Sequence, residues 1–103
     1  MTLCSSLNDV RQHIDRLDHD MVALIVERSH YVREAARFKK TRAEVVVPGR
    51  IEDIVTRVRH QADALGGDPE LVEKIYRTMI DVYIWHEAKA WLALHGAESN
   101  LPK

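Results

Sequence analysis

Hydrophobic side chains recur at alternating steps of three and four residues from residue 6 to about residue 40, a segment without Gly or Pro. This spacing places them along one face of an α-helix. Ser6, with an acidic residue three positions later at Asp9, has the pattern of a helix-capping motif. We therefore predict one unbroken helix over about 6–40. Its stripe consists of Leu7, Val10, Ile14, Leu17, Met21, Leu24, Arg28, Tyr31, Ala35 and Phe38.

Residues 41–49 interrupt this pattern. They include three consecutive valines and end in Pro48-Gly49, so we expect a loop. Apolar residues then return at helical spacing and predict a second helix over about 50–65, which Gly66 and the glycine after it are expected to end.

A third helix is predicted over about 69–95. Asp68 supplies a capping side chain and Pro69 a residue suited to the first helical position. Gly96 is expected to end the helix, which leaves 97–103 as a tail.

The first predicted helix is too long for the domain that carries it. At 1.5 Å per residue, roughly 35 residues extend about 52 Å, whereas a compact chain of about 100 residues is only roughly 35 Å across. An apolar stripe that projects from its own domain needs cover, and a second copy of the chain is the commonest cover. We therefore expect a homodimer with this helix near the two-fold axis.

Composition agrees with an all-α fold in a single domain over 1–103. Gly and Pro together supply only 7 of 103 residues, too few for a turn-rich β fold. Basic residues number 15 and acidic residues 16, which gives no electrostatic reason to bind nucleic acid or a membrane. One cysteine, no signal-peptide pattern and no long apolar run predict a cytoplasmic protein.

Arg28 stands in the middle of the apolar stripe, where a charge is unfavourable unless it is paired. Lys39 lies about 20° around and about 16 Å along the same helix, so the two cations share a face. Arg11 lies about 25 Å before Arg28 and can approach it only from an antiparallel partner chain. The ordinary alternative is that all three are solvated charges or salt-bridge partners.

Glu87 is the corresponding anomaly in the third helix, because Tyr83 and other apolar residues share its side of the helix. A buried carboxyl group favours its neutral, hydrogen-donating form. The alternative is a glutamate paired with a lysine or arginine. His86 and Glu87 begin like a zinc-protease motif, but Ala90 stands where the second ligand belongs, so no metal site is predicted.

Residues 7–91 resemble the all-helical, type II class of chorismate mutases, and within it the isochorismate pyruvate lyases. This resemblance implies an intertwined homodimer of three-helix chains. The matching stretches are Val10-Arg11, Ile14-Asp15-Arg16-Leu17-Asp18, Glu27-Arg28, Ala36-Arg37-Phe38-Lys39, Pro48-Gly49-Arg50, and Tyr83-Ile84 through Trp91.

The resemblance also implies roles for individual residues. Arg11 would reach one substrate carboxylate from the partner chain, while Arg28 holds the other. Lys39 and Glu87 would flank the ether oxygen whose bond breaks. Arg50 would help to close the loop over the pocket. Tyr83 would lie among the substrate-binding residues.

Where family mutases carry an acidic pair near the start of the second helix, this chain has Val47 and Ile51. The loss of those acceptors favours a lyase that converts isochorismate to salicylate and pyruvate, with mutase side activity. A dedicated chorismate mutase, which forms prephenate, remains the first alternative. A non-catalytic helical dimer is the second. Both reactions are pericyclic, so the resemblance implies no metal and no cofactor.

Overall fold

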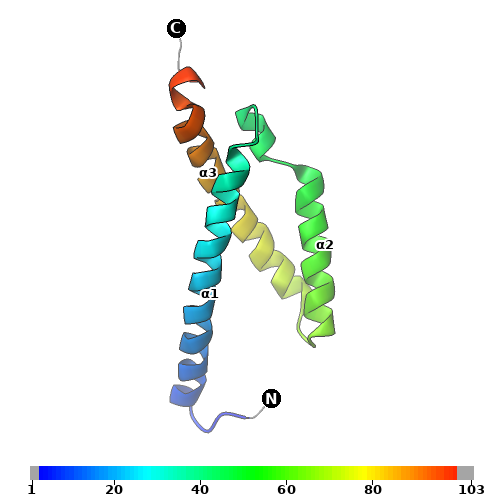
Figure 1. Cartoon of the computed structure of the whole chain (residues 1–103). Coiled ribbons are helices and arrows are strands. Elements are labelled where there is room, and N and C mark those ends of the chain that lie inside the picture. Colours follow the sequence, from blue (N-terminus) through cyan, green and yellow to red (C-terminus); the bar gives the residue numbers. More distant parts are fainter. Residues whose placement is uncertain (1–2, 100–103) are drawn as a thin grey trace. The chain divides into compact units, whose positions relative to one another are not determined.

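The computed structural model describes residues 3–99, which fold into helices without a strand (Figure 1). The predicted all-α fold with three main helices is confirmed for this part of the chain. The elements are α1 (Leu7–Ala36), a short 3-10 helix η1 (Arg42–Val45), α2 (Pro48–Ala64) and α3 (Pro69–Ser99).

The chain divides into two compact units, Met1–Tyr31 and Val32–Lys103. The helix α1 continues from the first unit into the second, whereas η1, α2 and α3 all belong to the second. The expectation of a single domain over 1–103 stays a prediction.

The start of α1 follows from its capping residues. The Ser6 hydroxyl oxygen accepts a hydrogen bond from the amide of Asp9 at 3.0 Å, and the Asp9 carboxylate accepts one from the amide of Ser5 at 3.1 Å. These bonds satisfy donors that have no partner within the helix. The predicted start of the first helix is therefore confirmed.

The end of α1 differs from the prediction, because the helix stops at Ala36 and not near residue 40. The amides of the next three residues donate to carbonyls three positions earlier, at 3.1, 3.0 and 3.3 Å, which tightens the chain as it leaves the helix. Ala36 is fully buried, but Phe38, the last residue of the predicted stripe, is 75% exposed. The helix therefore ends before the last position of the predicted stripe, and that position is exposed.

The segment predicted as a loop contains the short helix η1. The amide of Lys40 donates to the Glu44 carboxylate at 2.8 Å, and Val45 is buried at 5% exposure. The helix α2 begins at Pro48, two residues before the predicted start. Proline breaks a helix in its interior but suits the first turn, where its missing N–H has no partner to lose.

The turn between α2 and α3 has the predicted chemistry. Gly66 adopts a left-handed conformation with φ of 76°, and the amide of Gly67 donates to the Ala62 carbonyl at 2.8 Å. The Asp68 carboxylate then accepts a hydrogen bond from the amide of Glu70 at 2.9 Å, so Asp68 caps α3.

The predicted end of α3 at Gly96 is wrong, because the helix continues to Ser99. A glycine weakens a helix by about 1 kcal/mol relative to alanine but does not by itself end it. It ends a helix when it turns left-handed, as Gly66 does. Of the predicted tail, residues 97–99 are helical, and 100–103 lie outside the described residues.

The second unit is held together by apolar packing on α3. The helices α2 and α3 form a hairpin joined by the turn at Gly66 (Figure 1). Near the C-terminal part of α3, Ala36, Val45, Ala90 and Trp91 form a buried cluster. This cluster fixes the end of α1 and η1 against α3.

A charged network also joins α2 to α3. The Arg77 guanidinium donates two hydrogen bonds to Glu52, at 3.0 and 2.9 Å, and one to Glu73 at 2.7 Å. Arg59 donates to the same Glu73 at 2.6 Å. Hydrogen bonding from Arg77 holds the pKa of both carboxyl groups below its ordinary value, and Arg59 lowers that of Glu73 further.

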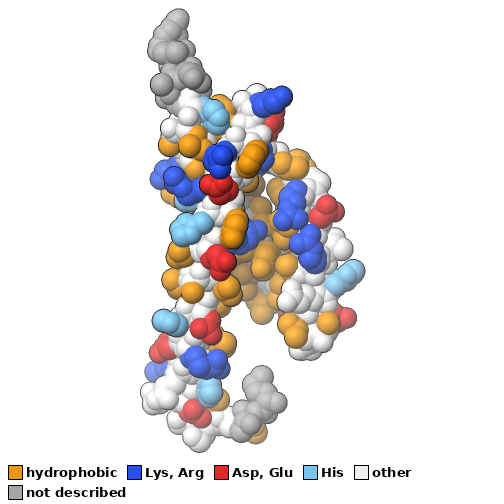
Figure 2. Space-filling view, viewed as in Figure 1, with side chains coloured by type: hydrophobic (Ala, Val, Ile, Leu, Met, Phe, Trp, Pro, Cys, Tyr) orange, Lys and Arg blue, Asp and Glu red, His pale blue; other side chains and the backbone are white. Residues whose placement is uncertain are grey.

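The apolar stripe of α1 is exposed within the first unit. Its first six members are 37–63% exposed, and Figure 2 shows hydrophobic side chains at the surface along this helix. They are Leu7, Val10, Ile14, Leu17, Met21 and Leu24. Monomeric proteins rarely expose so long an apolar face. None of the described helices is long and apolar enough to cross a membrane.

Candidate functional site

Lys39 and Glu87 form an ion pair between the segment after α1 and the middle of α3. The Lys39 ammonium donates to a Glu87 carboxylate oxygen at 2.8 Å, although the two residues are 48 positions apart. The Lys39 side chain is 21% exposed and that of Glu87 is 10% exposed. The structure therefore brings these two predicted site residues into direct contact in a partly buried position.

The helix α3 explains why a carboxylate is buried here. Tyr83 lies one turn before Glu87 and Trp91 one turn after it, so the three share a face. Both aromatic residues are buried, at 7% and 6% exposure. Burial of a charge is tolerated when an opposite charge donates to it. Lys39 is this partner, as predicted by the alternative in which Glu87 pairs with a lysine or arginine. The expectation of a neutral carboxyl group was based on burial alone and did not include this partner.

Trp91 makes a contact with Lys39 that the sequence did not predict. Its indole Nε1 donates a hydrogen bond to the main-chain carbonyl of Lys39 at 2.9 Å. In the sequence, Trp91 stands at the end of a stretch that resembles the family, and no contact was predicted for it. A tryptophan one turn after a buried glutamate was the available signal, because an indole N–H inside a protein needs an acceptor.

The other predicted site residues of the second unit have different environments. Arg50 is exposed in the first turn of α2. Val47, which precedes α2, is 43% exposed, and Ile51 is partly buried. The first turn of α2 therefore presents a cation, but neither of these two positions carries a carboxylate that could accept a hydrogen bond.

Arg11 and Arg28 belong to the first unit, where both lie on α1. Arg11 is exposed, and Arg28 is partly buried. Seventeen helical residues separate them by about 25 Å along the axis. Within one chain these two guanidinium groups therefore cannot hold the same small ligand.

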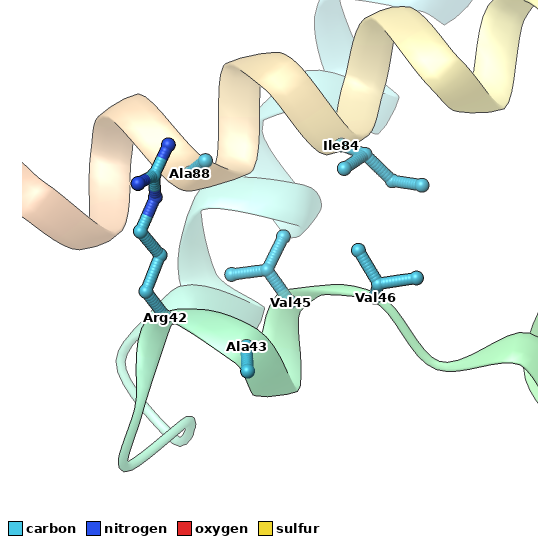
Figure 3. Close-up of a pocket in the computed structure, with 6 residues that line it drawn as sticks. All are labelled: Arg42, Ala43, Val45, Val46, Ile84 and Ala88. Carbon is cyan, nitrogen blue, oxygen red and sulfur yellow. The ribbon is translucent and has the colours of Figure 1, made fainter.

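A pocket of about 410 Å³ lies between η1 and α3. Figure 3 shows the side chains of Val45 and Val46 directed toward Ile84 and Ala88, with Arg42 extending beside Ala88. Apart from Arg42 its lining is apolar. Lys39 and Glu87 are not among the residues that line it.

One group of side chains near the start of α1 has the composition of a metal site. The potential ligand atoms of Cys4, Asp9 and His13 all lie within 4.8 Å of one another. The Asp9 carboxylate is already engaged by the amide of Ser5. Elsewhere, His86 has a buried Nε2 without a hydrogen-bond partner in the described part of the chain. The expectation that the reaction needs no metal stays a prediction.

The fold and the Lys39–Glu87 pair define an all-α protein with a partly buried, charged site on its last helix. The chain belongs to the type II chorismate mutase family, whose model matches residues 10–88. This range contains all six predicted site residues. Membership confirms the predicted resemblance and makes the chain a pericyclic enzyme of that family.

A curated relative refines the comparison. The chain is 34% identical over 94 residues to a protein named isochorismate pyruvate lyase from Pseudomonas aeruginosa. The similar region covers 91% of this chain and 93% of the relative. The similarity thus extends over nearly the whole length of both proteins.

Proposed function

We propose that the protein is an isochorismate pyruvate lyase that converts isochorismate to salicylate and pyruvate, with chorismate mutase side activity. The observation that carries the proposal is the ion pair between Lys39 and Glu87, found in a chain that is 34% identical to a protein of that name. The Lys39 ammonium and, in its protonated form, the Glu87 carboxyl group can place two hydrogen-bond donors at one substrate oxygen. The ether oxygen of isochorismate is the atom that gains charge as its bond breaks.

The proposed site divides its residues by task. Arg28 and Arg11 each bind one substrate carboxylate, because a guanidinium matches a carboxylate with two parallel hydrogen bonds. Lys39 and Glu87 act at the ether oxygen. Arg50 holds the segment before α2 closed over the substrate. Tyr83, one turn from Glu87, packs against the substrate ring.

Arg11 acts in this scheme from a second copy of the chain. The exposed apolar stripe of α1 supports a homodimer, because a partner helix would cover it. The long separation of Arg11 and Arg28 along α1 supports a contribution in trans, since one chain cannot bring both to the same ligand.

The reaction needs little from the protein beyond binding and charge stabilisation. A hydrogen atom moves within isochorismate from the ring to the enolpyruvyl methylene carbon as the ether bond breaks. The ether oxygen becomes the keto oxygen of pyruvate, and the ring becomes aromatic. No external proton, electron or cofactor enters this balance.

The energies required are within reach of these residues. A rate factor of about 10⁶ corresponds to roughly 8 kcal/mol. Two donors at the ether oxygen supply about 3 kcal/mol each. Two arginines that hold the flexible enolpyruvyl arm in its reactive orientation supply the remainder.

Val47 and Ile51 favour isochorismate over chorismate as the substrate. A carboxylate at either position would accept a hydrogen bond from a substrate hydroxyl, and a valine or isoleucine cannot. A dedicated chorismate mutase is the second candidate, because the family is named for that reaction. We also propose a cytoplasmic location, which the single cysteine supports.

A product assay tests the proposal. Purified protein is given isochorismate, and salicylate is measured by its fluorescence while pyruvate is measured enzymatically. We expect the two products in equal amounts, at a rate well above that of isochorismate alone. Prephenate from chorismate without any salicylate from isochorismate would identify the mutase instead.

A further inference from the structure

Lys39 lies beyond the last residue of α1, where no helical bond fixes its carbonyl group. The helix ends at Ala36, and the amide of Lys39 donates back to the Ala36 carbonyl at 3.3 Å, the longest of the three bonds in this tightened turn. The segment then continues toward η1. The position of a lysine in such a segment depends on contacts other than helical hydrogen bonds.

Two residues of α3 hold Lys39 at its two ends. The Trp91 indole donates to the Lys39 carbonyl at 2.9 Å, and the Lys39 ammonium donates to Glu87 at 2.8 Å. Trp91 and Glu87 are one helical turn apart, about 6 Å along the axis. The Lys39 side chain therefore lies along α3, from the carbonyl at Trp91 to the ammonium at Glu87.

Trp91 is itself fixed firmly enough to act as an anchor. It is 6% exposed and belongs to the buried cluster with Ala36, Val45 and Ala90. The imidazole ring of His95 lies against the indole ring, with 4.6 Å between ring centroids. His95 Nδ1 also lies 3.1 Å from the Trp91 carbonyl oxygen.

We propose that Trp91 is a positioning residue, whose indole N–H binds the Lys39 carbonyl and so sets the place of the Lys39 ammonium in the reaction. The inference rests on the proposed role of Lys39 at the ether oxygen and extends it to a residue that has no role in the proposed site. A phenylalanine at position 91 would fill most of the same volume but would leave the Lys39 carbonyl without its donor. The indole N–H of Trp91, and not the bulk of its ring, is thus the group that acts on the reaction.

The first test compares two Trp→Phe substitutions. Trp91→Phe removes the indole N–H at the buried position, and Trp85→Phe makes the same chemical change on the same helix at a side chain that is 59% exposed. We expect Trp91→Phe to lower kcat by roughly threefold to tenfold, the effect of losing one hydrogen bond, with a smaller change in KM. Trp85→Phe should leave kcat unchanged. Equal kcat values for both variants and the unsubstituted protein would overturn the proposal.

A second test separates positioning from a purely structural role. If Trp91 acts through the Lys39 ammonium, Trp91→Phe should have almost no further effect on kcat in a Lys39→Ala background. An undiminished effect in that background would show that Trp91 acts by another route. If Lys39→Ala alone leaves turnover intact, the proposed role of Lys39 fails first. Loss of activity in Lys39→Ala with full activity in Trp91→Phe contradicts only the inference about Trp91.

A third measurement needs no change at position 91 and so does not depend on the folding of that variant. The chain has two tryptophans, and Trp85→Phe assigns the remaining ¹⁵N indole signal to Trp91. We expect the Trp91 indole proton to exchange with solvent at least about tenfold more slowly than that of Trp85. We also expect its signal to shift in Lys39→Ala, because loss of the ion pair with Glu87 releases the segment whose carbonyl the indole binds. Fast exchange, or a signal that Lys39→Ala does not move, would overturn the proposal.

Discussion

The Lys39 ammonium lies 2.8 Å from a carboxylate oxygen of Glu87, and the side chain of Glu87 is only 10% exposed. In this pair Glu87 accepts a hydrogen bond, whereas a donor is what the ether oxygen of the substrate needs. A dianionic substrate competes for the Lys39 ammonium. We therefore expect Glu87 to act on the bound substrate in its neutral form, donating a hydrogen bond to the ether oxygen without transferring its proton.

Glu87→Gln tests this exchange through the pH dependence of turnover. Because the donating form of a carboxyl group is lost as pH rises, wild-type kcat should fall by up to about tenfold per pH unit above the inflection. An amide donates at every pH, so Glu87→Gln should flatten the profile. Glu34→Gln, which changes an exposed glutamate paired with Arg37, is the matched control. An identical profile in Glu87→Gln would show that Glu87 does not donate.

Lys39→Ala should lower kcat by about 10²–10³, the usual effect of removing one donor from a developing oxyanion. Lys40→Ala is the control, because Lys40 is adjacent to Lys39 and exposed. Its hydrogen bond to Glu44 is made by the main-chain amide, which the substitution keeps. Steady-state kinetics with isochorismate measure both. Equal losses in the two variants would mean that general charge near this segment, and not the pair with Glu87, supports the reaction.

Mixing of inactive variants tests whether Arg11 acts from the partner chain. Arg11→Ala and Arg28→Ala should each be nearly inactive. In a dimer that contains one copy of each, one site combines both substitutions and the other has neither. After random exchange of chains, about a quarter of the wild-type activity should return. A mixture of Arg28→Ala with Lys39→Ala should recover none, because both residues serve the same chain's site. No recovery in the first mixture would contradict the trans arrangement.

The network between α2 and α3 predicts a loss of stability in acid. The pKa values of Glu52 and Glu73 are lowered by hydrogen bonds from Arg77. Their contribution is therefore present above the ordinary carboxyl pKa and is lost as pH falls through the lowered values. Urea unfolding at about pH 7 and about pH 3 should show that Arg77→Gln destabilises the protein at the higher pH and much less at the lower one. Arg57→Gln, a change at an exposed position of α2, should show no such difference.

The sequence predicted the parts of the fold that depend on local chemistry. The Ser6 cap, the left-handed Gly66 and the Asp68 cap each act within a few residues, so their pattern was sufficient. The end of α1 was mispredicted because the stripe continues to Phe38, and only the structure shows that Phe38 lies beyond the helix and is exposed.

Of the candidate site, the structure shows the contact between Lys39 and Glu87, and the roles of the site residues stay predictions. Charged residues at apolar positions identified Arg28 and Glu87, and the family resemblance added Lys39 as the partner at the reacting bond. The bond from Trp91 to the Lys39 carbonyl was missed, because a hydrophobic pattern does not register the single polar atom of a tryptophan. The dimer and the role of Arg11 stay predictions, since they concern a second chain.

The measurement that tests the account most directly is the ratio of kcat/KM for isochorismate to kcat/KM for chorismate on the same purified protein. With Val47 and Ile51 in place of carboxylates, we predict a ratio well above one, with salicylate and pyruvate formed from isochorismate and only slow formation of prephenate from chorismate. A ratio of one or less would contradict the proposed lyase and identify the protein as a chorismate mutase.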